Sequence, residues 1–180
     1  ADVKVTSDKE MIEQADKVIL PGVGAFGDCM KNLEATGLIP TIKQLVADGR
    51  PMLGICVGLQ ILFDGSEESP GAKGLGLIHG MVKKINAPSL KIPHMGWNSL
   101  TIREKREPHD LFRGLVEHPY VYFVHSYHAV PDDPSVITAT TEYGEQLTAS
   151  VAAGNLQATQ FHPEKSGDVG LSILKNFIEG

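Results

Sequence analysis

Hydrophobic and polar residues change rhythm several times along the first third of the chain. Three short apolar runs, rich in aliphatic residues, predict buried strands at residues 3–6, 17–20 and 51–55. Amphipathic stretches between and after these runs predict helices at residues 7–15, 26–34, 39–47 and 57–63. Ser7 and Glu10 have the spacing of a capping box at the start of the first helix. Strands that alternate with helices indicate parallel pairing, with the helices as crossovers.

From residue 75 onward, strand-like runs dominate the pattern. They predict six strands, at residues 75–85, 97–103, 120–126, 136–142, 146–151 and 156–161. Glycine-containing connections at 143–145 and 153–155 indicate antiparallel hairpins. A last amphipathic helix is predicted at residues 167–178. Because the sequence contains no repeat or linker, we expect a single α/β domain over residues 1–180. Its central sheet should be mostly parallel, flanked by helices, and partly antiparallel in the second half.

Composition adds several exclusions to this picture. Hydrophobic residues make up 42% of the chain, as in ordinary globular proteins, and the net charge of −6 argues against nucleic-acid binding. The sequence has no apolar run of membrane-spanning length and no signal peptide, so we expect no membrane association. The two cysteines, Cys29 and Cys56, form no CxxC pair. This pattern disfavours a zinc site or a disulfide framework, and it favours a reducing compartment, the cytoplasm.

The segment from Gly54 to Gly58 places a cysteine between a predicted strand and a predicted helix. A nucleophile on such a turn projects from the end of the sheet, and flanking glycines relieve crowding there. The N-terminus of the following helix is expected to lower the pKa of Cys56, and the Val57 N–H is a natural oxyanion donor. Alternatively, Cys56 is a small buried apolar residue at a strand end. Cys29 lies inside a helical pattern and is expected to be structural.

A cysteine nucleophile requires a base, and His162 is the best placed of the seven histidines. It follows a predicted strand and precedes Pro163, which favours an extended backbone at His162. Glu164 would then point the same way and orient the imidazole. The alternatives are a solvated turn with an incidental ion pair, or a metal ligand, although no further His or Cys lies at ligand spacing nearby. His125, at a strand end, could line a pocket, and His94 is expected in a loop.

Several motifs together resemble one enzyme family. Gly54 to Gln60 and His162 to Glu164 match the Gly-Ile-Cys-x-Gly-x-Gln and His-Pro-Glu motifs of class I, triad-type glutamine amidotransferases. Further segments resemble the glutaminase subunits of imidazole glycerol phosphate synthase, an enzyme of histidine biosynthesis, at residues 20–26, 93–98, 122–127 and 162–167. The resemblance runs from the first residues to the last. It implies the three-layer class I glutamine amidotransferase fold.

This resemblance implies a role for each residue of the candidate site. Cys56 would attack the side-chain amide of glutamine, His162 would carry the proton to the departing ammonia, and Glu164 would orient His162. Backbone N–H groups of Val23 and Val57 would form the oxyanion hole, and the glycines of the 21–24 loop would permit a peptide flip. L-Glutamine would also contact Gly54, Gln60, Ser126 and Tyr127.

The resemblance also implies a second protein. Ammonia would pass to a (β/α)₈-barrel cyclase subunit, within a heterodimer that makes imidazole glycerol phosphate and aminoimidazole carboxamide ribotide. Trp97 and Asn98 are expected at that interface, although Trp97 could instead cap the core at a strand start. Lys165 is expected to pair with an acidic residue of the partner, or else to be solvated. No metal and no cofactor are implied.

Relative to that family, the chain starts at the second strand, so we expect an N-terminally truncated domain. The family's first strand, the following Gly/Asn-rich loop and the first helix are absent, which would leave a neighbouring strand unpaired and weaken the domain. Three other functions stay open. They are an amidotransferase of another pathway (aminobenzoate, pyridoxal phosphate or guanylate synthesis), a related α/β cysteine peptidase, and a binding-only regulatory homologue. The segment around Trp97 argues against the first, and the complete triad argues against the last.

Overall fold

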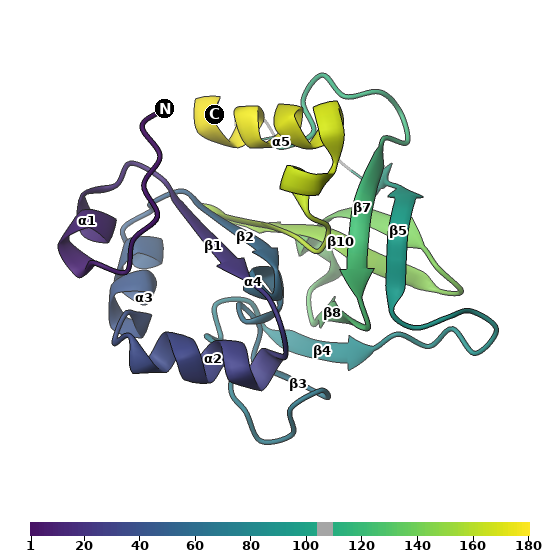
Figure 1. Cartoon of the computed structure of the whole chain (residues 1–180), viewed down its shortest axis with the longest axis horizontal. Helices are drawn as coiled ribbons and strands as arrows, with labels where there is room; N and C mark the ends of the chain where they lie inside the picture. Colours follow the sequence, from purple (N-terminus) through teal and green to yellow (C-terminus); the bar gives the residue numbers. More distant parts are fainter. Residues whose placement is uncertain (104–109) are drawn as a thin grey trace.

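A six-stranded mixed sheet forms the centre of the computed structural model, which describes residues 1–103 and 110–180 (Figure 1). In spatial order its strands are β1 (Val18–Gly22), β2 (Met52–Cys56), β11 (Leu156–Thr159), β10 (Gln146–Ala153), β9 (Ile137–Glu142) and β6 (Thr101–Ile102). Strands β1, β2 and β11 are parallel, and the pairings from β11 to β6 are antiparallel. The predicted α/β class and antiparallel hairpins are therefore confirmed, with a larger antiparallel share than expected.

Helices lie on both sides of the parallel strands and complete the predicted three-layer arrangement. They are α1 (Lys9–Gln14), α2 (Phe26–Ala35), α3 (Ile39–Ala47), α4 (Val57–Gln60) and α5 (Gly167–Glu179). Figure 1 shows α1, α2 and α3 grouped beside β1 and β2, with α5 across the other side. Helix α5 buries Ile173 and Phe177 in the core. Burial of side chains of this size stabilises the fold by about 1.5–3 kcal/mol each.

Two smaller sheets complete the second half of the chain. One contains β3 (Gly65–Ser66), β4 (Gly80–Lys84) and β8 (Tyr127–Pro131), and the other contains β5 (His94–Ser99) and β7 (Tyr120–His125). Two 3₁₀ turns are η1 (Pro134–Val136) and η2 (Pro163–Lys165). The predicted strand at 97–103 is thus split between β5 and β6, and His94 begins β5 instead of lying in a loop. Strand β8 was not predicted, because its run follows β7 without an intervening turn signal.

Three further expectations for individual elements are wrong. The described residues 1–8 include no strand, and Val3 and Val5 are 75% and 103% exposed, so no packing holds this segment in the sheet. Helix α1 starts after Asp8, whose Oδ1 accepts a hydrogen bond from the Met11 N–H at 2.9 Å. Asp8 therefore caps the helix in place of Ser7. Helix α4 ends at Gln60, short of the predicted residue 63.

The parallel strands bring three loops to one edge of the sheet. In the register, Gly22 pairs with Cys56, and Ile55 pairs with Thr159. The chain leaves β1, β2 and β11 at this common carboxyl edge, where ligands of open α/β sheets usually bind. Strand β2 is buried along its whole length between β1 and β11. The end of β2 is therefore a rigid platform for whatever side chain follows.

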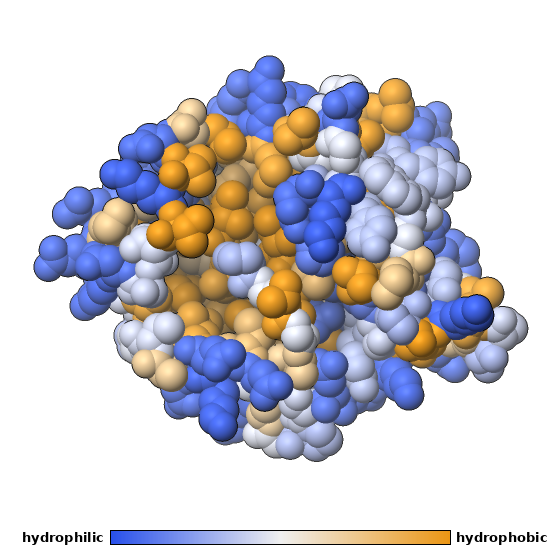
Figure 2. All heavy atoms as spheres, in the orientation of Figure 1, coloured by the Kyte–Doolittle hydropathy of each residue, from blue (hydrophilic) through white to orange (hydrophobic). Residues whose placement is uncertain are grey.

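Hydrophobic side chains also gather in a hollow on the face shown in Figure 2, over the region of β1 between α3 and α5. Strand β1 is at an edge of the six-stranded sheet, and its Ile19 is 41% exposed.

Among the residues that the structure describes, no helix is long and apolar enough to cross a membrane.

Candidate active site

Cys56 occupies the sharp turn between β2 and α4. Its backbone has φ 57° and ψ −114°, a left-handed conformation that a residue with a Cβ rarely adopts. Such strain persists only where the surrounding structure enforces it, and it is common at functional sites. The predicted strand-to-helix turn is confirmed. Cys56 is buried, with 6% exposure.

Glycines permit the close packing that enforces this turn. A Cβ on Gly58 would overlap the Leu20 carbonyl oxygen, so only glycine lets α4 approach β1 this closely. A Cβ on Gly54 would lie 2.8 Å from the Gly58 carbonyl oxygen. The structure thus gives Gly54 a packing role, and it is not among the described residues that line the cavity. Its contact with glutamine stays a prediction.

His162 lies just after β11 with one ring nitrogen fixed. Its Nδ1 is 2.7 Å from Glu164 Oε1, the orienting contact that the sequence predicts. The backbone of His162 is extended, as expected, but Pro163–Lys165 form the 3₁₀ turn η2 instead of continuing an extended segment. The turn, and not strand alternation, carries the Glu164 carboxylate back to the ring. Nε2 of His162 is buried and has no partner among the described residues.

Two residues that sequence reasoning missed hold the His162 backbone. The Ser166 hydroxyl donates to the His162 carbonyl at 2.6 Å and accepts from the Tyr122 N–H at 3.0 Å. The His162 N–H donates to the Tyr122 carbonyl at 3.0 Å. Ser166 is only 1% exposed. Ser166 lies within the segment 162–167 that resembles the family, but its sequence gives no sign of this role.

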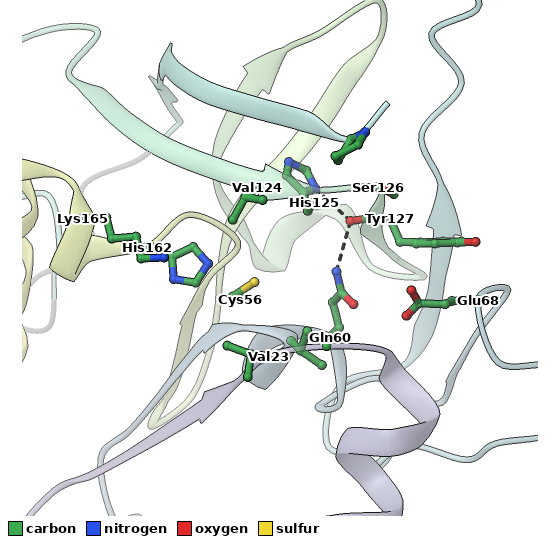
Figure 3. Close-up of a pocket in the computed structure, with 13 residues that line it drawn as sticks. Val23, Cys56, Gln60, Glu68, Val124, His125, Ser126, Tyr127, His162 and Lys165 are labelled. Carbon is green, nitrogen blue, oxygen red and sulfur yellow. Dashed lines mark hydrogen bonds between the residues drawn. The ribbon is translucent and has the colours of Figure 1, made fainter. Parts of the chain in front are cut away.

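A cavity of about 330 Å³ opens beside Cys56. Figure 3 shows the His162 ring beside Cys56 on one side of the cavity, with Gln60 on the other side. The sequence-predicted residues at the cavity wall are Val23, Cys56, Val57, Gln60, Ser126, Tyr127, His162 and Lys165. The structure therefore brings together most of the predicted site, drawn from four separate stretches of chain. His125 lines the cavity, as its position at a strand end predicts, and Gly24 lines it from the predicted oxyanion loop. No role was predicted for the other wall residues, Glu68, Pro93 and Val124.

Gln60 is held by hydrogen bonds at the floor of the cavity. It is 4% exposed, and its Nε2 donates to the Tyr127 carbonyl at 3.1 Å and to Gln160 Oε1 at 3.0 Å. Nε2 of Gln160 lies 3.9 Å from Cys56 Sγ. Gln160, on the loop after β11, was not predicted. Two acceptors hold the Gln60 Nε2 group, so the direction of the carboxamide oxygen is defined as well.

The electrostatics of Cys56 differ from the sequence prediction. Burial raises the pKa of the Cys56 thiol to about 11, and the hydrogen bond from the Val57 N–H opposes this only in part. Helix α4 has four residues, so its dipole is too short to offset the loss of hydration. The expected lowering of the Cys56 pKa is therefore wrong for this state of the protein. Here the thiol keeps its proton until a base accepts it.

Both predicted oxyanion donors belong to residues that line the cavity. The Val57 N–H already bonds the Cys56 side chain. Val23 lines the cavity from the loop after β1 and is 77% exposed, and the next residue, Gly24, has φ 83°. A positive φ at Gly24 is compatible with alternative peptide orientations in this loop.

A carboxylate that the sequence did not single out faces the cavity. Glu68 lines it from the loop after β3, and its Oε2 accepts a hydrogen bond from the Phe26 N–H at 2.8 Å, at the start of α2. Glu68 therefore lies at the end of the cavity away from His162 (Figure 3). It supplies negative charge where a cationic group of a ligand could bind.

The predicted interface residues lie on or near the exposed face of β5. Trp97 is 56% exposed and packs edge-on against Tyr122, with ring centroids 6.3 Å apart. This exposure excludes the alternative that Trp97 caps the core. Asn98 is half-buried and hydrogen-bonded, and Lys165 is exposed at the rim of the cavity. Their contact with a partner stays a prediction.

Nothing in residues 1–103 and 110–180 groups three or more His, Cys, Asp or Glu side chains as a metal site. What the arrangement does offer is acyl-transfer chemistry. A buried thiol, an imidazole with one nitrogen fixed by a carboxylate, and backbone N–H groups beside the sulfur are the parts of a cysteine nucleophile with its base and oxyanion donors.

Close relatives carry one name. The chain is 52% identical over 179 residues to imidazole glycerol phosphate synthase subunit HisH of Methanothermobacter thermautotrophicus, covering 99% of this chain and 86% of that protein. It is 51% identical over 180 residues to the protein of the same name from Syntrophotalea carbinolica, covering 97% and 86%.

Solved structures share the fold at low sequence identity. A crystal structure of a glutamine amidotransferase superposes with a TM-score of 0.74 at 21% identity, covering 99% of this chain and 86% of that one. PurLQS from Thermotoga maritima gives a TM-score of 0.69 at 21% identity, covering 91% and 79%. The family model for class-I glutamine amidotransferases matches residues 2–180. The chain therefore belongs to the class-I glutamine amidotransferase family.

Proposed function

We propose that this chain is the glutaminase subunit of an imidazole glycerol phosphate synthase and acts in histidine biosynthesis. It hydrolyses L-glutamine to glutamate and ammonia in one amidotransferase domain, residues 1–180. The relatives named HisH, about half identical over nearly the full chain, support the pathway. The observation that carries the chemistry is the Glu164–His162 contact of 2.7 Å at the wall of the cavity that holds Cys56.

The proposed reaction follows from these groups. His162 Nε2 accepts the Cys56 proton, and Sγ attacks the side-chain carbonyl carbon of glutamine. The Val57 N–H and a backbone N–H near Val23 stabilise the oxyanion. His162 then protonates the departing nitrogen, ammonia leaves, and a glutamyl thioester remains on Cys56. Water, deprotonated by His162, hydrolyses the thioester to glutamate and restores the thiol.

The charges of the cavity wall suit a glutamine molecule. Glu68 offers a carboxylate to the α-ammonium group, at the end away from His162. The walls at Ser126 and Tyr127 would hold the amino-acid head, and Gln60 would face its side chain. These contacts place the amide at Cys56, where the reaction takes place.

The ammonia is proposed to pass to a (β/α)₈-barrel cyclase subunit, because the relatives are named as subunits of a synthase. We assign Trp97, Asn98 and Lys165 to that interface. The exposure of Trp97 supports this assignment, since a large exposed aromatic side chain is a common interface anchor. We also propose a low glutaminase rate for the chain alone, because the loop with Gly24 at φ 83° can hold the second oxyanion donor in more than one orientation.

Glutamine hydrolysis titrated with the cyclase tests the proposal. We expect slow release of glutamate from the chain alone, and a rise that saturates at one cyclase per chain and increases further with the cyclase's nucleotide ligand. The variant Cys29→Ser, altered outside the cavity, should give the same titration. Rapid hydrolysis by the isolated chain, or no response to the cyclase, would refute the coupling.

A further inference from the structure

A continuous line of hydrogen bonds joins β5 to the cavity through two buried histidines. His94 Nε2 lies 3.2 Å from Asn98 Nδ2, and His94 Nδ1 lies 2.9 Å from His125 Nε2. His125 Nδ1 lies 2.8 Å from the Tyr127 carbonyl oxygen. We call Asn98, His94, His125 and the Tyr127 carbonyl the histidine chain. The triad does not use either histidine.

The fixed groups at its ends determine every proton in the histidine chain. The Tyr127 carbonyl can only accept, so His125 Nδ1 carries a hydrogen. Asn98 Nδ2 also donates to the Glu142 carbonyl at 2.8 Å, and Asn98 Oδ1 accepts from the Ser99 N–H, so the orientation of this amide is set. Its N–H therefore points at His94 Nε2, which must accept. His94 Nδ1 then donates to His125 Nε2.

Both histidines are neutral in this arrangement. A proton on His125 Nε2 would face the N–H of His94, and a proton on His94 Nε2 would face the amide hydrogens of Asn98. His94 and His125 are 2% and 6% exposed, and His94 is stacked between Phe123 and Tyr143 at centroid distances of 4.7 and 4.1 Å. Burial lowers the pKa of His94 to about 4 and that of His125 to about 3.

The histidine chain ends on a group that also organises the cavity. The Tyr127 carbonyl accepts from Gln60 Nε2 at 3.1 Å, in addition to His125. Gln60 continues to Gln160, whose Nε2 lies 3.9 Å from Cys56 Sγ. The tilt of the His125 ring therefore affects the position of the carbonyl on which the Gln60 carboxamide depends. Hydrogen-bonded chains of this kind are cooperative, since each bond polarises the next.

We propose that His94 and His125 are positioning residues, which set the Tyr127 carbonyl and the Gln60 carboxamide for binding of the substrate amide. They also connect the Tyr127 carbonyl and the Gln60 carboxamide to β5, the strand on which Trp97 is exposed. The inference rests on the proposed function, because it concerns how the same cavity binds glutamine. Neither histidine exchanges a proton with substrate.

Two variants of His94 separate positioning from packing. In His94→Asn, the side-chain amide occupies the place of Nδ1 and keeps a donor for His125. In His94→Gln, the amide reaches the place of Nε2, keeps the Asn98 contact and loses the donor to His125. Both remove the ring, so both lose the stacking on Phe123 and Tyr143. The two variants therefore differ mainly in which hydrogen bond they keep: His94→Asn keeps the bond to His125, and His94→Gln keeps the bond to Asn98.

Steady-state glutamine hydrolysis is measured for the full chain with the cyclase. We expect His94→Gln to raise KM for glutamine about tenfold with a smaller change in kcat, because the His125 acceptor loses its donor. We expect His94→Asn to stay within about twofold of the wild-type KM. An unchanged KM in His94→Gln, or an equal rise in both variants, would overturn the proposal.

A spectroscopic measurement covers the case in which the variants fold poorly. Long-range ¹H–¹⁵N correlation spectra of the wild-type chain at pH 7 report which nitrogen of each imidazole is protonated. We expect Nδ1–H and a bare Nε2 at both His94 and His125; the opposite tautomer at either would overturn the histidine chain. This result does not depend on glutaminase activity. A wild-type complex that leaves glutamine intact would count against the proposed function instead.

Discussion

Glu164 Oε1 lies 2.7 Å from His162 Nδ1, and this contact leaves His162 Nε2 as the acceptor beside Cys56. A carboxylate at Nδ1 fixes the tautomer and stabilises the imidazolium that forms when the thiol loses its proton. The Glu164 side chain is 49% exposed, whereas that of His162 is 6% exposed. The base is thus buried while its orienting carboxylate stays partly hydrated.

Glu164→Gln should lower kcat for glutamine hydrolysis about 100-fold with little change in KM, because the amide no longer stabilises the charged ring. The effect should be smaller than for a fully buried carboxylate, since water can partly replace this one. Rates at saturating glutamine measure it. Glu34→Gln, at an exposed position on α2, is the matched control. A Glu164→Gln enzyme with at least half of the wild-type kcat would contradict the orienting role.

Much of the fold follows from local patterns. Helix α3 and the two hairpins around β10 appear where spacing and turn residues predict them. The prediction of a strand at residues 3–6 was wrong because strand formation depends on a pairing neighbour, and a short apolar run carries no information about that neighbour. The end of α4 was also predicted wrongly, because residues 61–63 are hydrophobic and buried although they lie outside the helix.

Gly58→Ala should destabilise the protein by about 3 kcal/mol or more, because the new methyl group overlaps the Leu20 carbonyl and pushes α4 away from β1. Activity should fall with it, since α4 carries the Val57 N–H. Urea unfolding measures the free energy. Gly71→Ala is the control: φ is 87° there with open space around it, so the cost should be about 1–2 kcal/mol of backbone strain. Equal losses in both variants would show that packing at Gly58 is unimportant.

Stability should fall as the pH drops below about 6.5. His94 and His125 have folded-state pKa values of about 4 and about 3, below the ordinary value of 6.5, so the unfolded chain binds protons that the folded chain excludes. Their contribution is complete above pH 6.5 and is lost as the pH falls toward those values. Each contributes a slope of up to about 1.4 kcal/mol per pH unit. The hydrogen bond to the Tyr127 carbonyl raises the pKa of His125, whereas positive charge on His94, His128 or His162 lowers it.

Unfolding free energies of the wild type and of His94→Gln at pH 7, 6 and 5 measure this slope. The variant lacks one buried imidazole, so its stability should fall less steeply with pH. His79→Gln, which removes a histidine whose side chain is 82% exposed, controls for the loss of a histidine outside the core. A His94→Gln slope equal to that of the wild type would contradict the low pKa of His94.

The three central residues of the candidate site could be predicted from the sequence, whereas several residues around them could not. Cys56, His162 and Glu164 carry local signals, namely flanking glycines and a proline between base and carboxylate. Glu68, Gln160 and Ser166 carry none, because their roles arise only when separate loops meet at the carboxyl edge of the sheet. The pKa of Cys56 was mispredicted because the sequence reveals the helix after it and not the depth of its burial.

The most direct test of the account is glutamine hydrolysis by Cys56→Ala beside Cys29→Ala, each measured with the cyclase. Only Cys56 lies in the cavity with His162, whereas Cys29 lies on α2. We predict that Cys56→Ala lowers the rate at least about 1,000-fold, because no nucleophile remains to form the thioester, and that Cys29→Ala stays within about twofold of the wild type. A Cys56→Ala enzyme that retains more than about a tenth of the wild-type rate would contradict the account.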